Sequence, residues 1–197
     1  KLLPMTDTLD SWLAMLSERG FIFERLEGGE REFVFKHSFI QEVAYRMLLQ
    51  KHRVELHRAI AHAIEDVYKD QLEEYYERLA YHHQEGGQVE NAAAYWLLAA
   101  RRSRMHYDNE RAIEHYNKAL ALFESQPLKE TVEWKVRCTE AYLGRALACR
   151  LVGRYDEASK DLEKATQFAQ EAGDPALLVD VLNRRAGWQF GAHPQEE

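Results

Sequence analysis

An internal repeat constrains this chain more than any other feature of its sequence. The pattern Ala-x3-large-x2-Ala, where x is any residue, occurs three times. Residues three, four and seven apart share one face of an α-helix, so each copy places two small residues and one bulky residue on the same side. Small residues let two helices approach closely, and the bulky side chain fills the groove between them. The copies are Ala92/Trp96/Ala99, Ala112/Tyr116/Ala119 and Ala158/Leu162/Ala165.

A turn signal precedes each copy. The stretches "GGQVE", "HYDNE" and "GRYDE" begin at residues 86, 106 and 153. This arrangement resembles the tetratricopeptide repeat (TPR), a helix–turn–helix unit of about 34 residues. The spacing is irregular, because the first two copies start 20 residues apart and the last two 46 residues apart. We therefore predict a mainly α chain in which residues 71–197 form a TPR-like right-handed solenoid of helical hairpins.

The composition agrees with a helical protein that is not bound to a membrane or to nucleic acid. Only 10 glycines and 4 prolines occur in 197 residues, and the formal net charge is −7, which does not suit a phosphate-binding surface. The longest nearly apolar run, residues 92–100, is about half the length of a membrane span. Cys138 and Cys149 would lie about 16 Å apart along one helix, beyond the reach of a disulfide. We expect reduced thiols and a cytoplasmic location.

Residues 1–36 are predicted to be a partial winged-helix module. A helix is indicated by an apolar stripe that ends before Gly20, and either Asp7 or Thr8 is a candidate N-cap. The following "FIFERLEGGEREFVF" alternates around Gly-Gly, which predicts a β-hairpin. A helix followed by a hairpin is the second half of a winged helix, so we expect the chain, which begins at Lys1, to be a fragment of a larger protein. The stripe consists of Leu9, Trp12, Leu13 and Leu16.

Residues 37–70 are predicted to be a linking pair of helices. Ser38 and Gln41 have the spacing of a capping box, and an apolar face follows on Phe39, Val43 and Met47. A second helix is predicted from about His52 to Tyr68.

The histidines do not predict a metal site. His52, His57 and His62 are spaced by five residues and so do not share a helix face, whereas ligands on one helix need a spacing of three or four. His37 and His57 are instead expected to be partly buried packing or hydrogen-bonding residues. Phosphate-loop, dinucleotide-binding and zinc-protease motifs do not occur in the sequence. We expect no catalytic residues, no metal and no cofactor.

An arginine cluster is the candidate binding surface. Cations at the end of one helix and the start of the next can simply stabilise the helix C-terminus. They can also form a patch for an anion or an acidic peptide, which Arg145, Arg150 and Arg154 would extend. The cluster consists of Arg101, Arg102, Arg104 and Arg111.

The junction between the two parts resembles a known family. The stretch "FVFKHSFIQEVAYRMLLQKHRVELHRAIAHAIE" is similar to the segment that follows the nucleotide-binding domain in STAND-class ATPases, especially bacterial proteins in which this ATPase is fused to a class III adenylate/guanylate cyclase or a kinase. A family-like "LAYHH" follows at Leu79 to His83. The motif residues are Phe35, His37, Ser38, Phe39, Ile40, Glu42, Tyr45, Arg53, Leu56 and His57.

The resemblance implies a non-catalytic regulatory part of an intracellular signalling protein, because the family's ATPase and cyclase motifs lie upstream of this segment. The expected partners are the protein's own ATPase domain and another protein bound by the repeats. Self-association is a further expectation, through an apolar C-terminal edge formed by Leu177, Leu178, Val181, Leu182 and Trp188.

Two alternatives remain open at this stage. The first is a DNA-binding transcriptional regulator, although acids at Asp7, Asp10 and Glu18 would repel phosphate from the candidate reading helix. The second is a small-molecule or anion sensor with its site in the solenoid groove between Arg101 and Arg111.

Overall fold

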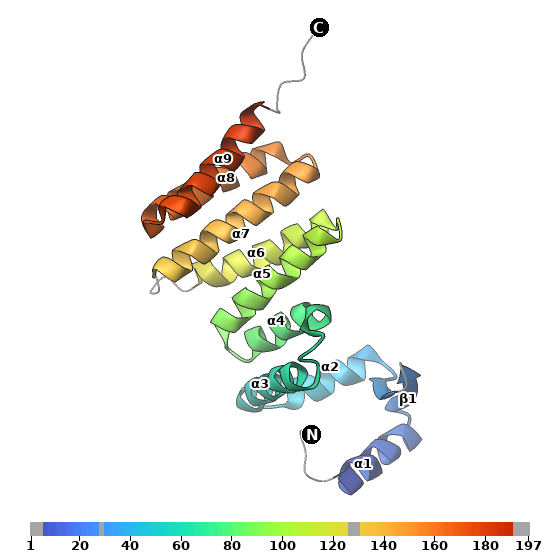
Figure 1. The fold of residues 1–197 in the computed structure, drawn as a ribbon. Coiled ribbons are helices and arrows are strands. Elements are labelled where there is room, and N and C mark those ends of the chain that lie inside the picture. The colour runs from blue at the N-terminus through green and yellow to red at the C-terminus, as the bar shows by residue number, and fades with distance from the viewer. Residues whose placement is uncertain (1–5, 28–29, 126–130, 191–197) are drawn as a thin grey trace.

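The computed structural model describes residues 6–27, 30–125 and 131–190 of the 197-residue chain. This part is mainly helical, with one two-stranded antiparallel sheet near its N-terminal end (Figure 1), which confirms the predicted fold class at that level. The elements are α1 (Thr6–Glu18), β1 (Ile22–Glu27), β2 (Glu30–Phe35), α2 (Ser38–Met47), α3 (Gln50–Val67), a 3-10 turn (Leu72–Tyr75), α4 (Tyr76–Glu85), α5 (Val89–Met105), α6 (Asn109–Glu124), α7 (Val132–Leu151), α8 (Tyr155–Ala172) and α9 (Pro175–Phe190).

Helices α4 to α9 form one stack in which each helix packs against the helix before it, while α5 also contacts α7 (Figure 1). One apolar cluster runs through this stack from Ala80 on α4 to Val181 on α9. All the side chains of the repeat pattern are buried, so the three helix faces predicted from the sequence are confirmed. They are Ala92, Trp96, Ala99, Ala112, Tyr116, Ala119, Ala158, Leu162 and Ala165.

Four of the turns between consecutive helices of the stack lie within the described residues, and they share one backbone feature. Each contains a residue with positive φ, namely Gly87 (70°), Tyr107 (61°), Gly153 (82°) and Gly173 (68°). This left-handed conformation lets the chain leave one helix and start the next after a single further residue. At the second turn that residue is Asp108, whose carboxylate accepts a hydrogen bond from the Arg111 backbone N–H at 3.2 Å. The break predicted at Pro127 lies outside the described residues.

A glycine allows α6 and α7 to approach closely. A Cβ atom at Gly144 on α7 would lie 2.3 Å from the hydroxyl oxygen of Tyr116 on α6, a distance that no side chain tolerates. Tyr116 is itself almost fully buried, at 2% exposure. The bulky residue of one repeat copy therefore packs directly on the backbone of the next helix.

The cysteines lie on one helix, as predicted. Cys138 and Cys149 are both on α7, and both are buried free thiols. Burial raises the pKa of Cys138 to about 12 and that of Cys149 to about 11. Both therefore pack as small apolar residues and are poor nucleophiles at neutral pH.

The N-terminal helix and hairpin are confirmed, but the predicted cap of α1 is wrong. Strands β1 and β2 pair in the register Ile22↔Phe35 to Glu27↔Glu30, and Gly20 has a φ of 74° just after α1. Helix α1 already includes Thr6, so Asp7 and Thr8 lie inside the helix and neither can be its N-cap.

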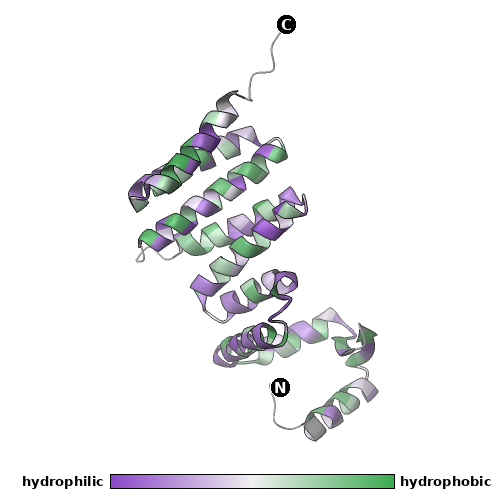
Figure 2. Ribbon diagram, viewed as in Figure 1, coloured by the Kyte–Doolittle hydropathy of each residue, from purple (hydrophilic) through white to green (hydrophobic). Residues whose placement is uncertain are grey.

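Helix α2 exists where its pattern predicts it, but nothing in the described structure buries its apolar face. No residue of α2 is buried, and Phe39 and Met47 are 71% and 80% exposed. Figure 2 shows hydrophobic residues along this helix, away from the main stack. The predicted capping box is also wrong, since His37 is the N-cap and Ser38 is the first helical residue.

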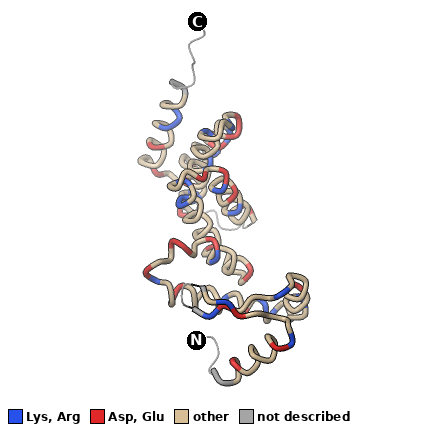
Figure 3. The backbone as a smooth tube through the Cα atoms, turned by 90° about the vertical axis from the view of Figure 1, so that its right-hand side faces the viewer, with Lys and Arg blue, Asp and Glu red and all other residues tan. Residues whose placement is uncertain are grey.

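Charged residues of both signs are distributed along the chain, as Figure 3 shows. Arg154, in the turn before α8, pairs with Glu110 of α6 at 2.6 Å, and Arg145 of α7 pairs with Asp161 of α8 at 2.6 Å. No helix in the described part of the chain has a segment long and apolar enough to cross a membrane.

Candidate interaction site

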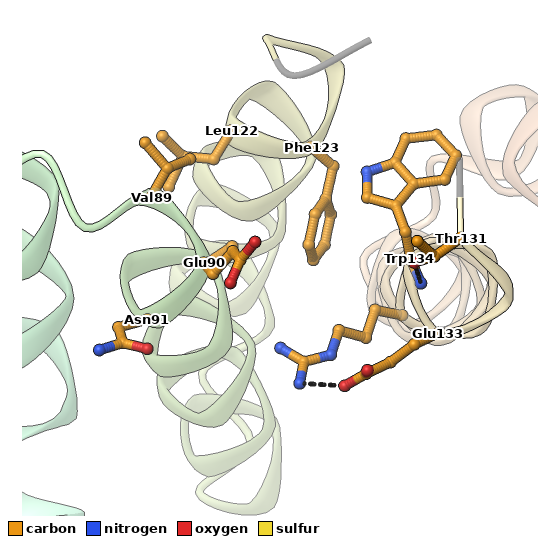
Figure 4. Close-up of a pocket in the computed structure, with 10 residues that line it drawn as sticks. Val89, Glu90, Asn91, Leu122, Phe123, Thr131, Glu133 and Trp134 are labelled. Atoms are coloured by element: carbon orange, nitrogen blue, oxygen red, sulfur yellow. Dashed lines mark hydrogen bonds and ion pairs between the residues drawn. The ribbon is translucent and has the colours of Figure 1, made fainter. Parts of the chain in front are cut away.

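A pocket of 470 Å³ opens where three helix ends meet (Figure 4). The start of α5, the end of α6 and the start of α7 form its walls, so residues far apart in sequence line one space. Its volume lies within the range of about 300–1,000 Å³ that is usual for ligand pockets. The lining residues are Val89, Glu90, Asn91, Ala93, Leu122, Phe123, Thr131, Glu133, Trp134 and Arg137.

Helix capping holds the α7 side of the pocket in place. The Thr131 hydroxyl is the N-cap of α7 and accepts a hydrogen bond from the Trp134 backbone N–H at 3.2 Å. This bond stabilises the first turn of the helix, on which Trp134 lies. The indole then packs edge-on against Phe168 of α8, with ring centroids 5.4 Å apart.

The pocket combines an apolar wall with a charged rim. Phe123 and Trp134 supply aromatic rings, and Arg137 donates to Glu133 at 2.7 Å across one turn of α7 (Figure 4). The indole nitrogen of Trp134 is buried and has no hydrogen-bond acceptor among the described residues. Such a buried donor costs about 1–3 kcal/mol, so packing must hold Trp134 in this position.

The four predicted arginines do not converge on one spot. Arg101 donates to Glu140 of α7 at 2.8 Å, whereas Arg111 pairs with Glu77 of α4 at 2.8 Å. Arg102 and Arg104 are half-buried. An incoming anion would have to displace carboxylates from Arg101 and Arg111, and the anion-patch hypothesis stays a prediction.

The predicted extension of the patch is also engaged within the chain. Arg145 donates to both carboxylate oxygens of Asp161, at 2.8 and 2.6 Å, and Arg150 lies over the Trp188 ring at 5.0 Å from its centroid. These contacts join α7 to α8 and α9.

The family-motif residues divide into two groups. Tyr45, Arg53 and His57 come together, with the Tyr45 hydroxyl 3.0 Å from His57 Nε2 and the Arg53 guanidinium 5.2 Å from the Tyr45 ring centroid. Glu42 pairs instead with Arg46 on the surface. Phe35 and His37 are exposed.

The two histidines expected to be partly buried differ. His57 is buried, with 5% exposure, as predicted. The prediction for His37 is wrong, because this residue is exposed at the start of α2 and its side chain makes no capping hydrogen bond. In the described part of the chain, no group of three or more His, Cys, Asp and Glu side chains is arranged to hold a metal ion.

Sequence reasoning missed a polar cluster between α3, α4 and α5. The Glu65 carboxylate lies 3.1 Å from His83 Nε2 and accepts from the Tyr95 hydroxyl at 2.8 Å. Its hydrogen bonds to Tyr95 and His83 hold the pKa of Glu65 below its usual value, although burial opposes them. His83 and Tyr95 lie 18 and 30 positions from Glu65 in the sequence, so no local motif predicts the cluster.

The C-terminal apolar edge is partly covered by α8. Val181 is fully buried, and Leu177, Leu178 and Trp188 pack against the apolar cluster, while Leu182 remains 42% exposed.

Neither a protein-family model nor a curated protein sequence matches this chain.

Proposed function

We propose that this chain is a non-catalytic regulatory and protein-interaction region of a larger intracellular signalling ATPase of the cyclase-associated type. In this proposal residues 71–197 are a TPR-like solenoid that binds a protein partner, and residues 1–70 connect it to the ATPase domain. The resemblance at Phe35 to His57 and the stack of packed helices from α4 to α9 support it.

The observation that carries the interaction role is the pocket between α5, α6 and α7. Its apolar wall suits a large apolar side chain from an extended segment of a partner. Its charged residues are Glu90, Glu133 and Arg137, which add to a formal charge of −1. A partner segment with an apolar anchor next to a lysine or arginine would complement this rim.

Peptide selection tests this role. The chain is panned against a random peptide library, and the affinity of selected peptides is measured by calorimetry. We expect an apolar anchor beside a basic residue. Asn91→Trp places an indole at the exposed rim of the pocket and should weaken binding about tenfold or more, the cost of roughly 1.4 kcal/mol.

The control for this variant is Asn183→Trp, which adds the same side chain to an exposed position on α9. Thermal melting of both variants shows whether the fold is kept. Equal affinity of selected peptides for the two variants would contradict the assignment of the pocket.

The open apolar face of α2 supports the contact with an ATPase domain. Phe39, Met47 and Leu49 are 71%, 80% and 69% exposed, and Trp12 on α1 is 56% exposed. Large apolar side chains with this degree of exposure are typical of a contact with another protein surface.

The complete coding sequence tests the larger assignment. A phosphate-binding loop encoded upstream of Lys1 is the expected result, and an upstream region without one would contradict it. The longer protein then allows a second measurement, in which Phe39→Ser with Met47→Ser should increase protease cleavage between the ATPase domain and α3. Leu151→Ser, an exposed position on α7, is the control.

A further inference from the structure

Two histidines face each other across the contact between α3 and α4. His57 Nδ1 lies 2.9 Å from His82 Nδ1, and the Tyr45 hydroxyl of α2 lies 3.0 Å from the other ring nitrogen of His57. His57 is 5% exposed, and the Tyr81 ring packs edge-on against it at 5.5 Å. One chain of contacts therefore joins α2, α3 and α4.

The contact between the two imidazole rings can hold only one hydrogen between its two Nδ1 atoms. Two nitrogens at hydrogen-bond distance share one hydrogen, so one Nδ1 donates and the other accepts. When both imidazoles are neutral, His57 Nε2 either accepts from Tyr45 or donates to it, and every bond is kept. When both are protonated, two N–H groups and two positive charges oppose each other at 2.9 Å. The contact cannot survive in that state.

The other buried histidines each have an acid beside them. His83 Nε2 lies 3.1 Å from Glu65, and His115 Nε2 lies 3.2 Å from Glu77. Burial lowers the pKa of His115, and the Glu77 carboxylate opposes that effect. Among the described residues, His57 and His82 have no such ion pair, since the partner of each is the other histidine.

The charged groups around His57 and His82 also differ from those around the other buried histidines. His57 faces Arg53 on its own helix and Glu85 on α4, while His82 has Arg78 and His83 beside it on α4. Burial first, and then the neighbouring positive groups, lower the pKa of His82 to about 4. The pKa of His57 is lowered chiefly by burial and less by Arg53, with Glu85 opposing.

We propose that the Tyr45–His57–His82 chain is a pH-sensitive joint, which loosens the contact of α2 and α3 with the helical stack in mildly acidic solution. The remaining contacts of α3 with α4 are of other kinds. Arg58 Nε donates to the Gly86 carbonyl at 2.6 Å, and Glu65 binds His83. Loosening therefore starts at the end of the interface where α2 is attached.

The direction of the pH effect on the joint follows from how many protons the closed and open states bind. A histidine whose pKa is lowered in the closed state binds protons more readily once the joint opens, so closure is fully favoured above pH 6.5 and loses free energy as the pH falls below it. With a pKa of about 4 closed and 6.5 open, His82 alone raises the opening constant about tenfold between pH 7.5 and 5.5. His57 adds to this change in the same direction.

Hydrogen exchange tests the joint. Opening constants of α3 amides are measured at pH 7.5 and 5.5, after correction for intrinsic exchange rates, and compared with those of α7. The expected result is a rise of about tenfold or more in α3 and a smaller rise in α7. His82→Asn retains a hydrogen-bonding group near the Nδ1 position but cannot titrate. Between pH 7.5 and 5.5, the rise in the α3 opening constant should therefore be about tenfold smaller in this variant than in the original chain.

His52→Asn is the control, because His52 is an exposed histidine on α3, the helix whose amides are measured. It should retain the full response to acid. An unchanged acid response in His82→Asn would overturn the proposal, as would an equal rise in α3 and α7 of the original chain. If His82→Asn does not fold, NMR titration of the original chain decides instead. The His82 ring resonance should stay in the neutral form at pH 5.5, and a His82 midpoint near 6.5 would refute the joint.

Discussion

The absence of a side chain at Gly144 determines how closely α6 and α7 can pack. Tyr116 occupies the space that a Cβ atom would take, with its hydroxyl oxygen and two ring carbons 2.3, 2.4 and 2.7 Å from that position. A buried ring held by packing on several sides cannot move away at little cost. The distance between α6 and α7 therefore depends on both residues, the missing side chain at Gly144 and the ring of Tyr116.

Gly144→Ala should destabilise the protein. Overpacking of this kind costs about 1–3 kcal/mol, while alanine gains about 1 kcal/mol in helix propensity, so a net loss of up to about 2 kcal/mol is expected. Gly187→Ala is the control, because a Cβ atom at Gly187 on α9 meets nothing within 4 Å. Urea denaturation measures both variants. Stabilisation by both substitutions would show that Tyr116 moves aside freely.

Predictions for single residues were correct where they rest on a repeating pattern, and wrong where the position of a helix start or of one side chain depends on a single residue. The buried triads such as Ala112/Tyr116/Ala119 follow from helix periodicity alone. The capping residue of α2 does not, because Ser38 and His37 are adjacent and the helix begins one residue earlier than the capping box requires. Burial of His57 but not His37 depends on α4, which is distant in sequence.

At the scale of elements, the α7–α8 pair contains an ion pair with unequal burial. The Asp161 side chain is 5% exposed and that of Arg145 is 23% exposed. Hydrogen bonds and the charge of Asp161 raise the pKa of Arg145, although burial opposes them. Removing one partner leaves the other charge buried, and the penalty depends on which charge remains.

Arg145→Leu should therefore lower the free energy of unfolding more than Asp161→Asn does. The first leaves a carboxylate without its cation in the interior and should lower the free energy of unfolding by about 3–5 kcal/mol. The second leaves an arginine that can still reach water and Asn117, to which it already donates at 2.5 Å. Denaturant midpoints of the two variants provide the comparison. Equal losses would mean that burial does not set the cost.

The positions of the helices were easier to predict from the sequence than the elements that pack against them. The apolar stripe at Phe39, Val43 and Met47 correctly predicts α2, yet these residues lie on its exposed side. Periodicity reports that a face is apolar and says nothing about what covers it. The pocket was missed for a related reason, since Val89, Phe123 and Trp134 meet only after three helices pack together.

On the scale of the whole molecule, stability should be distributed unequally along the chain. The apolar cluster extends from Ala80 to Val181, whereas α2 has no buried residue. Segments with few buried contacts open at low free energy, independently of the core.

Amides of α2 should therefore exchange with solvent on the order of 100-fold faster than those of α6 at neutral pH. Hydrogen exchange read out by mass spectrometry on the whole chain measures this ratio. Ile113→Ala, at a buried position of α6, should lower protection throughout α5–α8 but leave α2 unchanged. A common rate for α2 and α6 would indicate that the chain opens as one unit.

The shared conformation of the turns has a consequence for how such a chain can lengthen. Gly87, Tyr107, Gly153 and Gly173 reverse the chain in the same way, although only one of them has a side chain. A duplicated helix pair would begin and end in the geometry that its new neighbours already use. Growth by gene duplication would then require no new turn, only a matching pair of small residues on the next helix face. The three copies of the pattern lie on α5, α6 and α8, so the 46-residue interval spans two helix steps and the 20-residue interval only one.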